Sequence, residues 1–269
     1  MKQRVFGLVL VVAVMLCAST RSEAKKCPEL AASYGFAVFS NLFGPWNQVD
    51  LGAITLKCDG SLDGIDSETY TPFPYPSDAQ PANSTFPITG TWTVDDDGIN
   101  GTITSDAIGG LNFVVDDDGD VLRLTGVGGL YQVGRAVRQD PKYIAKLVAG
   151  KIKGRPNDSL QCTGYNPNVP FPEFPAGVPV SIQGTEVTNK NGYLFKGVAS
   201  GNFFSNSLTS TTPPAVTNVN TDGTGSGTDG FGTPFNFVAT APGQDFFTVS
   251  LVPDFLGYCT VHPRDNGNN

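Results

Sequence analysis

A repeated turn motif constrains the fold of this chain more than any other feature. The stretches Thr93–Thr102 and Thr217–Ser226 both place an Asp-Gly turn among alternating apolar residues. They lead into Leu111–Val114 and Phe235–Val238, which share the letters Asn-Phe-Val. Asp-Gly flanked by such runs is typical of a β-hairpin. The repeat therefore predicts two related β-units.

The two copies align with almost no gap. Gly98 falls on Gly223 and Gly119 falls on Gly243, at turns where glycine can supply a positive φ. We interpret the match as duplication of a β scaffold. The aligned turn Ala241–Gln244 has no carboxylate cluster, which argues against a duplicated metal site.

The N-terminus has the pattern of a secretory signal. Lys2 and Arg4 form a positive start, Val5–Ala18 is apolar, and small residues precede a mature start near Lys25, which gives a signal peptide at 1–24. The apolar run of about 14 residues is shorter than the ~20 that span a bilayer. We expect a secreted, periplasmic or cell-surface protein with no membrane span after cleavage.

Removal of the leader takes away Cys17 and leaves Cys27, Cys58, Cys162 and Cys259. An even number of cysteines in an oxidising compartment predicts two disulfides, and four cysteines allow three pairings. The repeat favours Cys27 with Cys58 and Cys162 with Cys259. Metal binding is the weaker interpretation, because no CxxC or Cys/His spacing is present.

Composition favours many short strands. With 32 Gly, 20 Pro and 16% charged residues, we predict an all-β fold of two related antiparallel β-barrel (or sandwich) units, joined by a short helix and a Pro-rich crossing segment. The predicted boundaries are a first β-unit at 25–139, a linking helix and Pro/Asn-rich loop at 140–176, a second β-unit at 177–264 and a disordered tail at 265–269.

Eight strands are predicted in the first unit, which suits a closed barrel or a sandwich. Alternation is clearest in Ile88–Val94, where Thr occupies one face. The predicted strands are Ser33–Ser40, Val49–Cys58, Gly64–Thr71, Ile88–Asp95, Ile99–Ser105, Leu111–Asp116, Val121–Thr125 and Leu130–Val137.

The pattern changes after Gln139. Ile144, Leu147 and Val148 follow at helical spacing, and Asp140 with Pro141 fits an N-cap and a first helical position. We predict a linking helix here.

Charge is polarised along the chain. Cys27–Leu122 holds 15 acidic residues and one basic residue, whereas Arg123–Arg155 holds eight basic residues and one acidic residue. The basic stretch could dock on an acidic surface or on the acidic unit of a second copy, so self-association is one interpretation, and a solvated helix face is the other. Nucleic acid is not an expected partner, because the net charge is −8.

Two acidic turns are candidate cation sites. Asp116, Asp118 and Asp120 lie in the densest cluster, and Asp95–Asp97 form a second. Calcium is the ion that would suit several oxygen ligands. The alternative is a solvated hairpin turn, because Asp-Gly also serves turn conformation. No other cofactor is expected.

No catalytic motif stands out. His262 is the single histidine, and the GxSxG, HExxH, Walker A and GxGxxG patterns are missing. A carboxylate pair for glycoside hydrolysis remains open, because its separation is a three-dimensional quantity. The sequence singles out no pair among the many acids.

Aromatic residues interleaved with proline mark a candidate ligand site. Phe73 and Tyr75 lie in one such segment, and Phe171 and Phe174 in another. Proline holds the backbone extended, so the rings could line the mouth of a barrel and grip a sugar or an apolar ligand. The alternative is that they cover the barrel ends as ordinary core.

The first unit resembles a group of uncharacterised bacterial secreted proteins. The likeness rests on Ser33–Phe36, Gly52–Gly60, Gly90–Gly98 and Phe113–Gly119. Proteins of that group look like calycin-type β-barrels related in shape to lipocalins and often carry paired cysteines. This chain differs at Gly98 and its repeat partner, where the group often has cysteine. The resemblance implies a barrel and no catalytic residue.

Taken together, these patterns predict a secreted, non-enzymatic β-barrel protein that binds a small apolar molecule or serves as a cell-surface or assembly component. Barrels of eight strands can hold one small ligand. One alternative is a barrel enzyme, either cyclase- or isomerase-like or a carbohydrate-active hydrolase. Another is a calcium-dependent adhesion module.

Overall fold

The computed structural model describes residues 28–42, 46–72, 82–116, 119–127, 131–149, 159–166, 178–189, 192–201, 204–209, 215–228, 234–251 and 255–262. Several predicted features lie outside these residues: the signal segment 1–24, Cys27, Phe73, Tyr75, Asp118, Phe171, Phe174 and the tail 265–269. Of Cys162 the backbone is described and the side chain is not.

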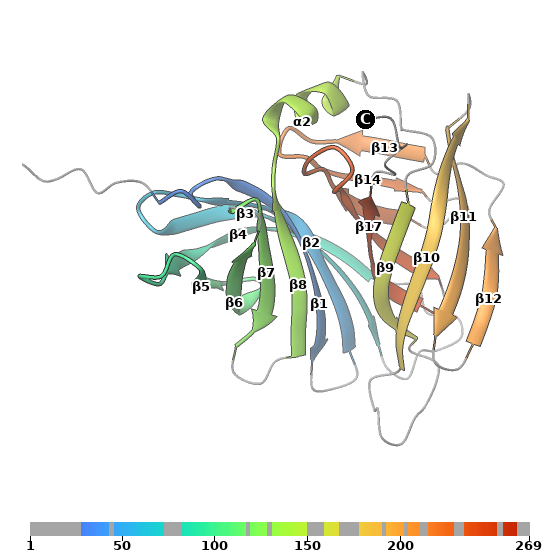
Figure 1. Cartoon of the computed structure of the whole chain (residues 1–269), viewed down its shortest axis with the longest axis horizontal. Helices are drawn as coiled ribbons and strands as arrows, with labels where there is room; N and C mark the ends of the chain where they lie inside the picture. The colour runs from blue at the N-terminus through green and yellow to red at the C-terminus, as the bar shows by residue number, and fades with distance from the viewer. Residues whose placement is uncertain are drawn as a thin grey trace, which may run out of the picture.

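The first part of the chain is a closed antiparallel barrel of eight strands (Figure 1). Each strand pairs with the next along the chain, and the eighth pairs with the first. The prediction of an eight-stranded β-unit is therefore confirmed as a barrel. Its strands are β1 (Ser33–Leu42), β2 (Trp46–Leu56), β3 (Ser61–Pro72), β4 (Ala82–Val94), β5 (Asn100–Ser105), β6 (Gly109–Asp116), β7 (Val121–Gly126) and β8 (Tyr131–Arg138).

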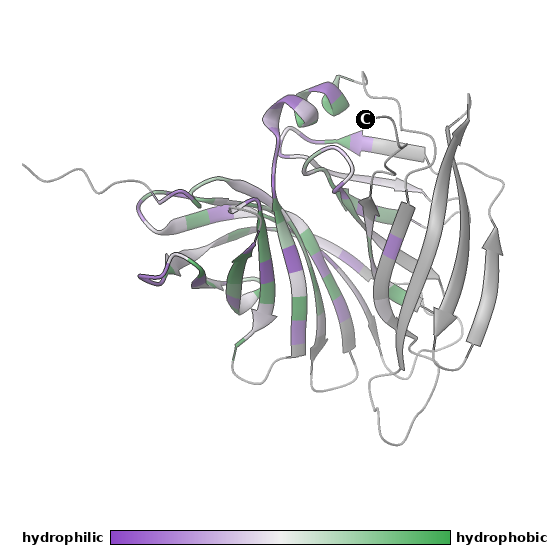
Figure 2. Cartoon of the chain, viewed as in Figure 1, coloured by the Kyte–Doolittle hydropathy of each residue, from purple (hydrophilic) through white to green (hydrophobic). Residues whose placement is uncertain are grey.

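Alternation along the strands separates the interior of the barrel from its outside. In β5 and β7 buried and exposed positions alternate, as period-two side chains require. Figure 2 shows the same alternation of hydrophobic and hydrophilic residues along the barrel strands. The buried core inside the barrel consists of Tyr34, Phe36, Val38, Ile54, Leu56, Leu62, Ile88, Trp92, Ile103, Leu111, Phe113, Leu122, Leu124 and Ala136, with Leu30 and Ile108.

A short helix follows the barrel, as the sequence predicts. Helix α2 (Pro141–Val148) has Asp140 as its N-cap, and the Asp140 carboxylate accepts a hydrogen bond from the Lys142 amide at 2.8 Å. Tyr143 donates a hydrogen bond of 2.5 Å to Asp245. The helix thus ties the end of the barrel to the second part of the chain.

The second part is a nine-stranded antiparallel sheet in the order β12-β11-β10-β9-β17-β16-β15-β14-β13. In the described residues β12 and β13 are its edges and do not pair with each other. The predicted second barrel is therefore not shown, and this unit is a sheet. The strands are β9 (Ser159–Asn166), β10 (Val178–Asn189), β11 (Gly192–Gly201), β12 (Phe204–Thr209), β13 (Ala215–Val219), β14 (Thr224–Thr228), β15 (Pro234–Val238), β16 (Phe246–Leu251) and β17 (Phe255–His262).

The sheet packs on the outside of the barrel at β1 and β2 (Figure 1). One buried cluster joins barrel residues to residues of the sheet: Ala37, Leu51, Ala53, Val121, Val137, Val238 and Phe246, with Tyr258 packed against them. Phe39 and Val49 pack on Leu256 in a second cluster. Strands β1 and β2 are therefore buried on both faces, by the barrel core on the inside and by the sheet on the outside.

The aligned turns of the two units share their backbone geometry. Gly98 and Gly223 have φ of 72° and 86°, and Gly119 and Gly243 have 89° and 77°. The prediction of left-handed turn glycines is confirmed. Gly101 and Gly225 stand opposite Phe113 and Phe237, and each glycine leaves room for the facing ring. Duplication of the scaffold stays a prediction that this similarity favours.

In the described residues no helix is both long and apolar enough to cross a membrane.

Candidate functional site

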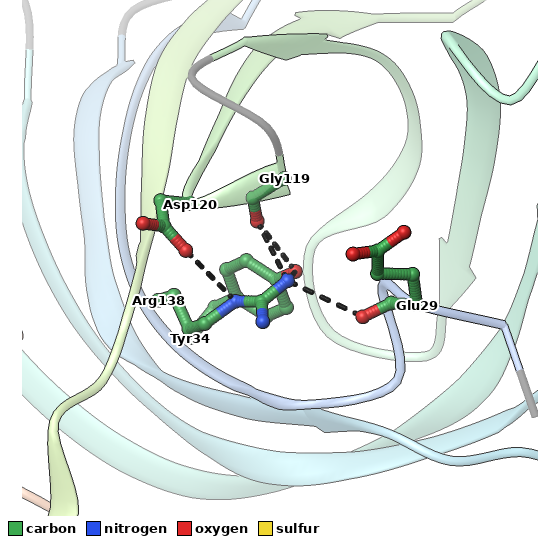
Figure 3. Close-up of polar contacts among 5 residues, drawn as sticks. All are labelled: Glu29, Tyr34, Gly119, Asp120 and Arg138. Carbon is green, nitrogen blue, oxygen red and sulfur yellow. Dashed lines mark hydrogen bonds and ion pairs between the residues drawn. The ribbon is translucent and has the colours of Figure 1, made fainter.

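One end of the barrel is closed by an arginine plug (Figure 3). The Arg138 guanidinium donates from Nη2 to the Gly119 carbonyl at 3.2 Å and to the Glu29 carbonyl at 3.3 Å. Its Nε lies 3.2 Å from Oδ1 of Asp120, and its Cζ lies 5.8 Å from the ring centroid of Tyr34. We call this group, with its five residues, the arginine plug.

Tyr34 completes the plug from inside. The ring is 0% exposed, and its hydroxyl donates to the Gly119 carbonyl at 2.9 Å. Burial raises the pKa of Tyr34, and the neighbouring Arg138 opposes that rise. Most polar groups of the plug therefore have hydrogen-bond partners, and Arg138 Nε, which has none among the described residues, is ion-paired with Asp120. This is the arrangement of a structural closure.

Beyond the plug the barrel is filled with packed side chains. Phe36, Phe113 and Leu111 are at most 1% exposed, and Trp92 donates from its indole nitrogen to the Lys57 carbonyl at 2.9 Å. Small eight-stranded barrels are commonly filled in this way.

The inner face near the end of the barrel opposite the plug carries three carboxyl groups. Asp50 on β2 is the direct partner of Glu68 on β3, and Asp66 is the direct partner of Gly52. Directly opposite residues share a face of the sheet, with Cβ atoms about 4.5–5.5 Å apart. Val38, a member of the interior core, is the β1 partner of Asp50, so this face points into the barrel. We call Asp50, Asp66 and Glu68 the acidic cluster and this end of the barrel the acidic end.

Asp50 is held by a polar network inside the barrel. Its carboxylate accepts hydrogen bonds from Gln48 Nε2 at 2.5 Å and from Ser40 Oγ at 3.2 Å. Gln132 Nε2 in turn donates to Ser40 Oγ at 3.2 Å. The network links β8, β1 and β2 and fixes the direction of the Asp50 side chain.

Asp66 is buried without a comparable network. It is 1% exposed, and in the described part of the chain neither of its carboxyl oxygens has a hydrogen-bond partner. The amides of Leu51 and Ser67 lie close enough to lower its pKa a little, but neither reaches hydrogen-bonding geometry. A buried polar group in this state costs roughly 1–3 kcal/mol.

The cluster holds protons more tightly than ordinary carboxyl groups do. Burial, together with the charge of Glu68, raises the pKa of Asp50 to about 7. Burial and the charges of Asp50 and Glu68 raise the pKa of Asp66 to about 9. Burial also raises the pKa of Glu68. At neutral pH the cluster therefore keeps protons that free carboxyl groups would have lost.

Four side chains near the acidic cluster are half-buried. Gln48, Glu68, Ser84 and Phe86 belong to the same inward face, since Glu68 pairs with Ser84 and Asp66 pairs with Phe86. All four are half-buried, in contrast to the buried Asp66. The buried Asp66 thus lies next to interior-facing side chains that keep some exposure to solvent.

A second hollow lies outside the barrel. It has a volume of about 680 Å³ and lies between α2 and the outer faces of β2 and β3, with Ala53, Ile65, Ile144 and Val148 among its lining residues. Asp63 in this lining is ion-paired with Lys57 at 2.7 Å. The lining combines this apolar surface with polar residues, among them Thr55, Gln139 and Asp222.

The acids that the sequence singled out lie at the plugged end where the structure describes them, as it does for Asp97, Asp116 and Asp120. Asp116 pairs with Arg123 at 2.6 Å, and Asp120 contacts Arg138. Asp97 accepts from the Asn100 and Ile99 amides and from the Asn100 side chain, and these hydrogen bonds lower its pKa. In the described residues no group of three His, Cys, Asp or Glu side chains is placed to hold a metal ion. The calcium site stays a prediction.

The sequence did not single out the acidic cluster, although it contained the signal. Both strands were predicted, and counting in twos from Leu56 and Leu62 puts Asp50 and Asp66 on the interior face. Alternation alone, however, does not say which of the two sets of residues in a strand faces the interior. At least one residue must first be known to be buried. His262 lies on β17, and its side chain is outside the described residues.

No protein-family model and no curated protein matches this chain. Among solved structures it is similar to kievitone hydratase from Nectria haematococca, with 7% identity and a TM-score of 0.25 over 90% of this chain and 94% of that chain. It is also similar to a porin-like protein from Bacteroides uniformis, with 9% identity and a TM-score of 0.22 over 86% and 96%. Likenesses at these TM-scores carry no argument about function.

Proposed function

We propose that this protein is a secreted, non-enzymatic β-barrel protein that binds one small molecule with an apolar body at the acidic end of its barrel. The observation that carries the proposal is Asp66, which is buried, unpartnered and directed into the barrel just below half-buried interior positions. A bound molecule would supply the missing hydrogen-bond partner.

The surroundings of Asp66 suit such a ligand. Phe86 is its direct partner on β4, and the ring of Phe36 lies over Gly52, where an added Cβ would be 3.0 Å from the Cε1 atom of Phe36. Ligand sites are mostly apolar with a few polar groups that orient the ligand. The arginine plug closes the opposite end, so a molecule would enter and leave through the acidic end.

Secretion is supported by the cysteines. Cys58 and Cys259 each take part in a disulfide. The backbone of Cys162 on β9 is directly opposite that of Cys259 on β17, and facing residues of antiparallel strands have the Cα separation that a disulfide needs. These facts favour the pairing of Cys162 with Cys259 and, by remainder, of Cys27 with Cys58. Disulfides of this kind persist in oxidising compartments.

The test uses two tryptophan substitutions at neighbouring positions. Ser84 faces the interior and Thr85 faces outward and is exposed. We expect Ser84→Trp to weaken binding of the neutral apolar dye Nile red by about tenfold or more, because one indole fills most of the volume of a small site. Thr85→Trp is the control and should bind as wild type does. Equal affinities for wild type and both variants would refute a ligand site at the acidic end.

One observation favours an enzyme as the second candidate. Asp50 and Asp66 hold protons to different degrees, and paired carboxyls with separated pKa values are typical acid–base assignments. In that case Asp66 would give a proton to the bound molecule while ionised Asp50 accepted one from it. Native mass spectrometry of protein purified from secreting cells would identify a retained molecule. Its conversion by wild type but not by Asp50→Asn would establish the enzyme, and its recovery unchanged would support the binding protein.

A further inference from the structure

We infer that the ligand of the acidic end is an organic cation, in which an ammonium group contacts Asp66, beside Asp50 and Glu68, and an apolar body extends toward the mouth of the barrel. The inference rests on the proposed function and names the class of molecule that this site selects.

The first step is the charge of the acidic end. Asp50, Asp66 and Glu68 face the interior from β2 and β3, with Tyr70 next on the same face, and the facing residues of β1, β4 and β8 are Ser40, Ser84 and Gln132. In the described barrel strands the inward-facing cation is Arg138, which belongs to the plug at the opposite end.

The connections at the acidic end add no positive charge. The segments 43–45, 73–81, 106–108 and 127–130 join the strands there, and by sequence they contain no Lys, Arg or His. Their charged residues are Asp78 and Asp106. Neither the described strands nor the sequence of these connections supplies a cation to the three carboxyl groups at this end, and a cationic ligand would.

The second step distinguishes an organic cation from a metal ion. In the described residues no three carboxyl, Cys or His side chains converge as a single metal ion requires. An ammonium group has three N–H donors that point in different directions. It can therefore donate to the two oxygens of Asp66, which have no hydrogen-bond partner among the described residues, without needing three carboxylates to converge.

The third step concerns the rest of the ligand. Phe86 is half-buried and directly opposite Asp66, while Phe36 and Val38 form the adjacent interior surface. An alkyl or aromatic body would cover these side chains, and a cation next to the ring of Phe86 would gain a cation–π contact. An inorganic cation would leave this apolar surface uncovered.

Proton linkage follows from the same geometry. The raised pKa values of the cluster mean that protons occupy it when no cation is bound. A cation favours the ionised carboxylates, so its binding at pH 7 should release protons. Affinity should rise from pH 6 to pH 9, where the carboxyls ionise and a primary amine of pKa about 10.4 is still charged.

The test compares octylamine, octan-1-ol and octanoate by titration calorimetry, in two buffers with different ionisation enthalpies at pH 7. We expect octylamine to bind about tenfold or more tighter than octan-1-ol, because charge-assisted hydrogen bonds are the stronger ones, and octanoate to bind most weakly. Of the three molecules, only octylamine should release protons from the acidic cluster when it binds.

Variants locate the effect. Asp66→Asn and Glu68→Gln should each lower the affinity for octylamine about tenfold and that for octan-1-ol by less, because the alcohol forms no charge-assisted hydrogen bond. Asp63→Asn is the matched control, since Asp63 is an exposed aspartate on β3 that faces outward. If Asp66→Asn fails to fold, the octylamine affinity of Glu68→Gln tests the inference, since Glu68 is only half-buried.

The outcomes separate the two proposals. If none of the three molecules nor Nile red binds, the proposed function is wrong. If octan-1-ol or octanoate binds as tightly as octylamine, the protein binds small molecules but does not select a cation. A preference for octylamine that survives both Asp66→Asn and Glu68→Gln also overturns the inference.

Discussion

Both ends of the barrel contain charged and polar groups, but the groups at the two ends differ in how many hydrogen-bond and ion-pair partners they have. At the plugged end Arg138 meets two carbonyls, an aspartate and a tyrosine. At the acidic end three carboxyl groups share an interior face, and Asp66 has no hydrogen-bond partner among the described residues. A polar group with partners stabilises a fold, whereas a buried one without them costs stability. The difference supports our proposal that the first end is structural and that the second binds a ligand.

The largest expected effect comes from breaking the plug. Arg138→Ala should lower the free energy of unfolding by about 3 kcal/mol, because the Gly119 carbonyl and the Tyr34 hydroxyl lose a charged donor. Arg123→Ala is the control, since its ion pair with Asp116 is exposed and should contribute less than about 1 kcal/mol. Urea unfolding of both variants measures the difference. Equal losses would show that the plug is no more than a surface contact.

The opposite sign is expected at the acidic end. At pH 9 Asp66→Asn should be more stable than wild type by about 2 kcal/mol, because replacing an uncompensated buried charge is often stabilising. The folded-state pKa of Asp66 is raised, so its contribution is greatest below the unfolded value of about 4 and is lost as pH rises toward about 9. Wild type should lose stability over this range and the variant should lose less. A variant that is less stable than wild type at pH 9 would mean that Asp66 has a structural partner.

Proton affinity offers a more direct comparison of the ends. Carboxyl signals followed by NMR should titrate near pH 7 for Asp50 and near pH 9 for Asp66. Hydrogen bonds at the plugged end lower the pKa of Asp97 and of Asp59, the latter chiefly through Ser61. Ser40→Ala should raise the pKa of Asp50 further, because one hydrogen bond to its carboxylate is lost. Similar titration points at both ends would remove the contrast.

The smallest effect is expected from removal of calcium. Asp116 and Asp120 of the predicted calcium site contact Arg123 and Arg138, so a chelator should shift the melting temperature by less than about 1 °C. A ligand that binds only the folded state raises that temperature, and its removal lowers it. A clear fall on addition of chelator would instead support the calcium-dependent adhesion module. Magnesium added back in place of calcium serves as the control.

The sequence by itself determined what depends on neighbours along the chain. Period-two alternation predicted the strands of the first unit, Asp140 and Pro141 predicted the start of α2, and Gly98 and Gly223 marked turns with a positive φ. Each of these signals is local, because the conformation of a turn or a helix start depends on a few adjacent residues.

Only the tertiary structure decided closure, packing and the site. The repeat predicted similar hairpins but could not show that one unit closes as a barrel while the other forms a nine-stranded sheet, because closure depends on pairing between distant strands. Asp50 and Asp66 are two of many acids in the sequence. They become a cluster only because the register of β2 against β3 puts them on one interior face, while the sheet covers the outer face of β2.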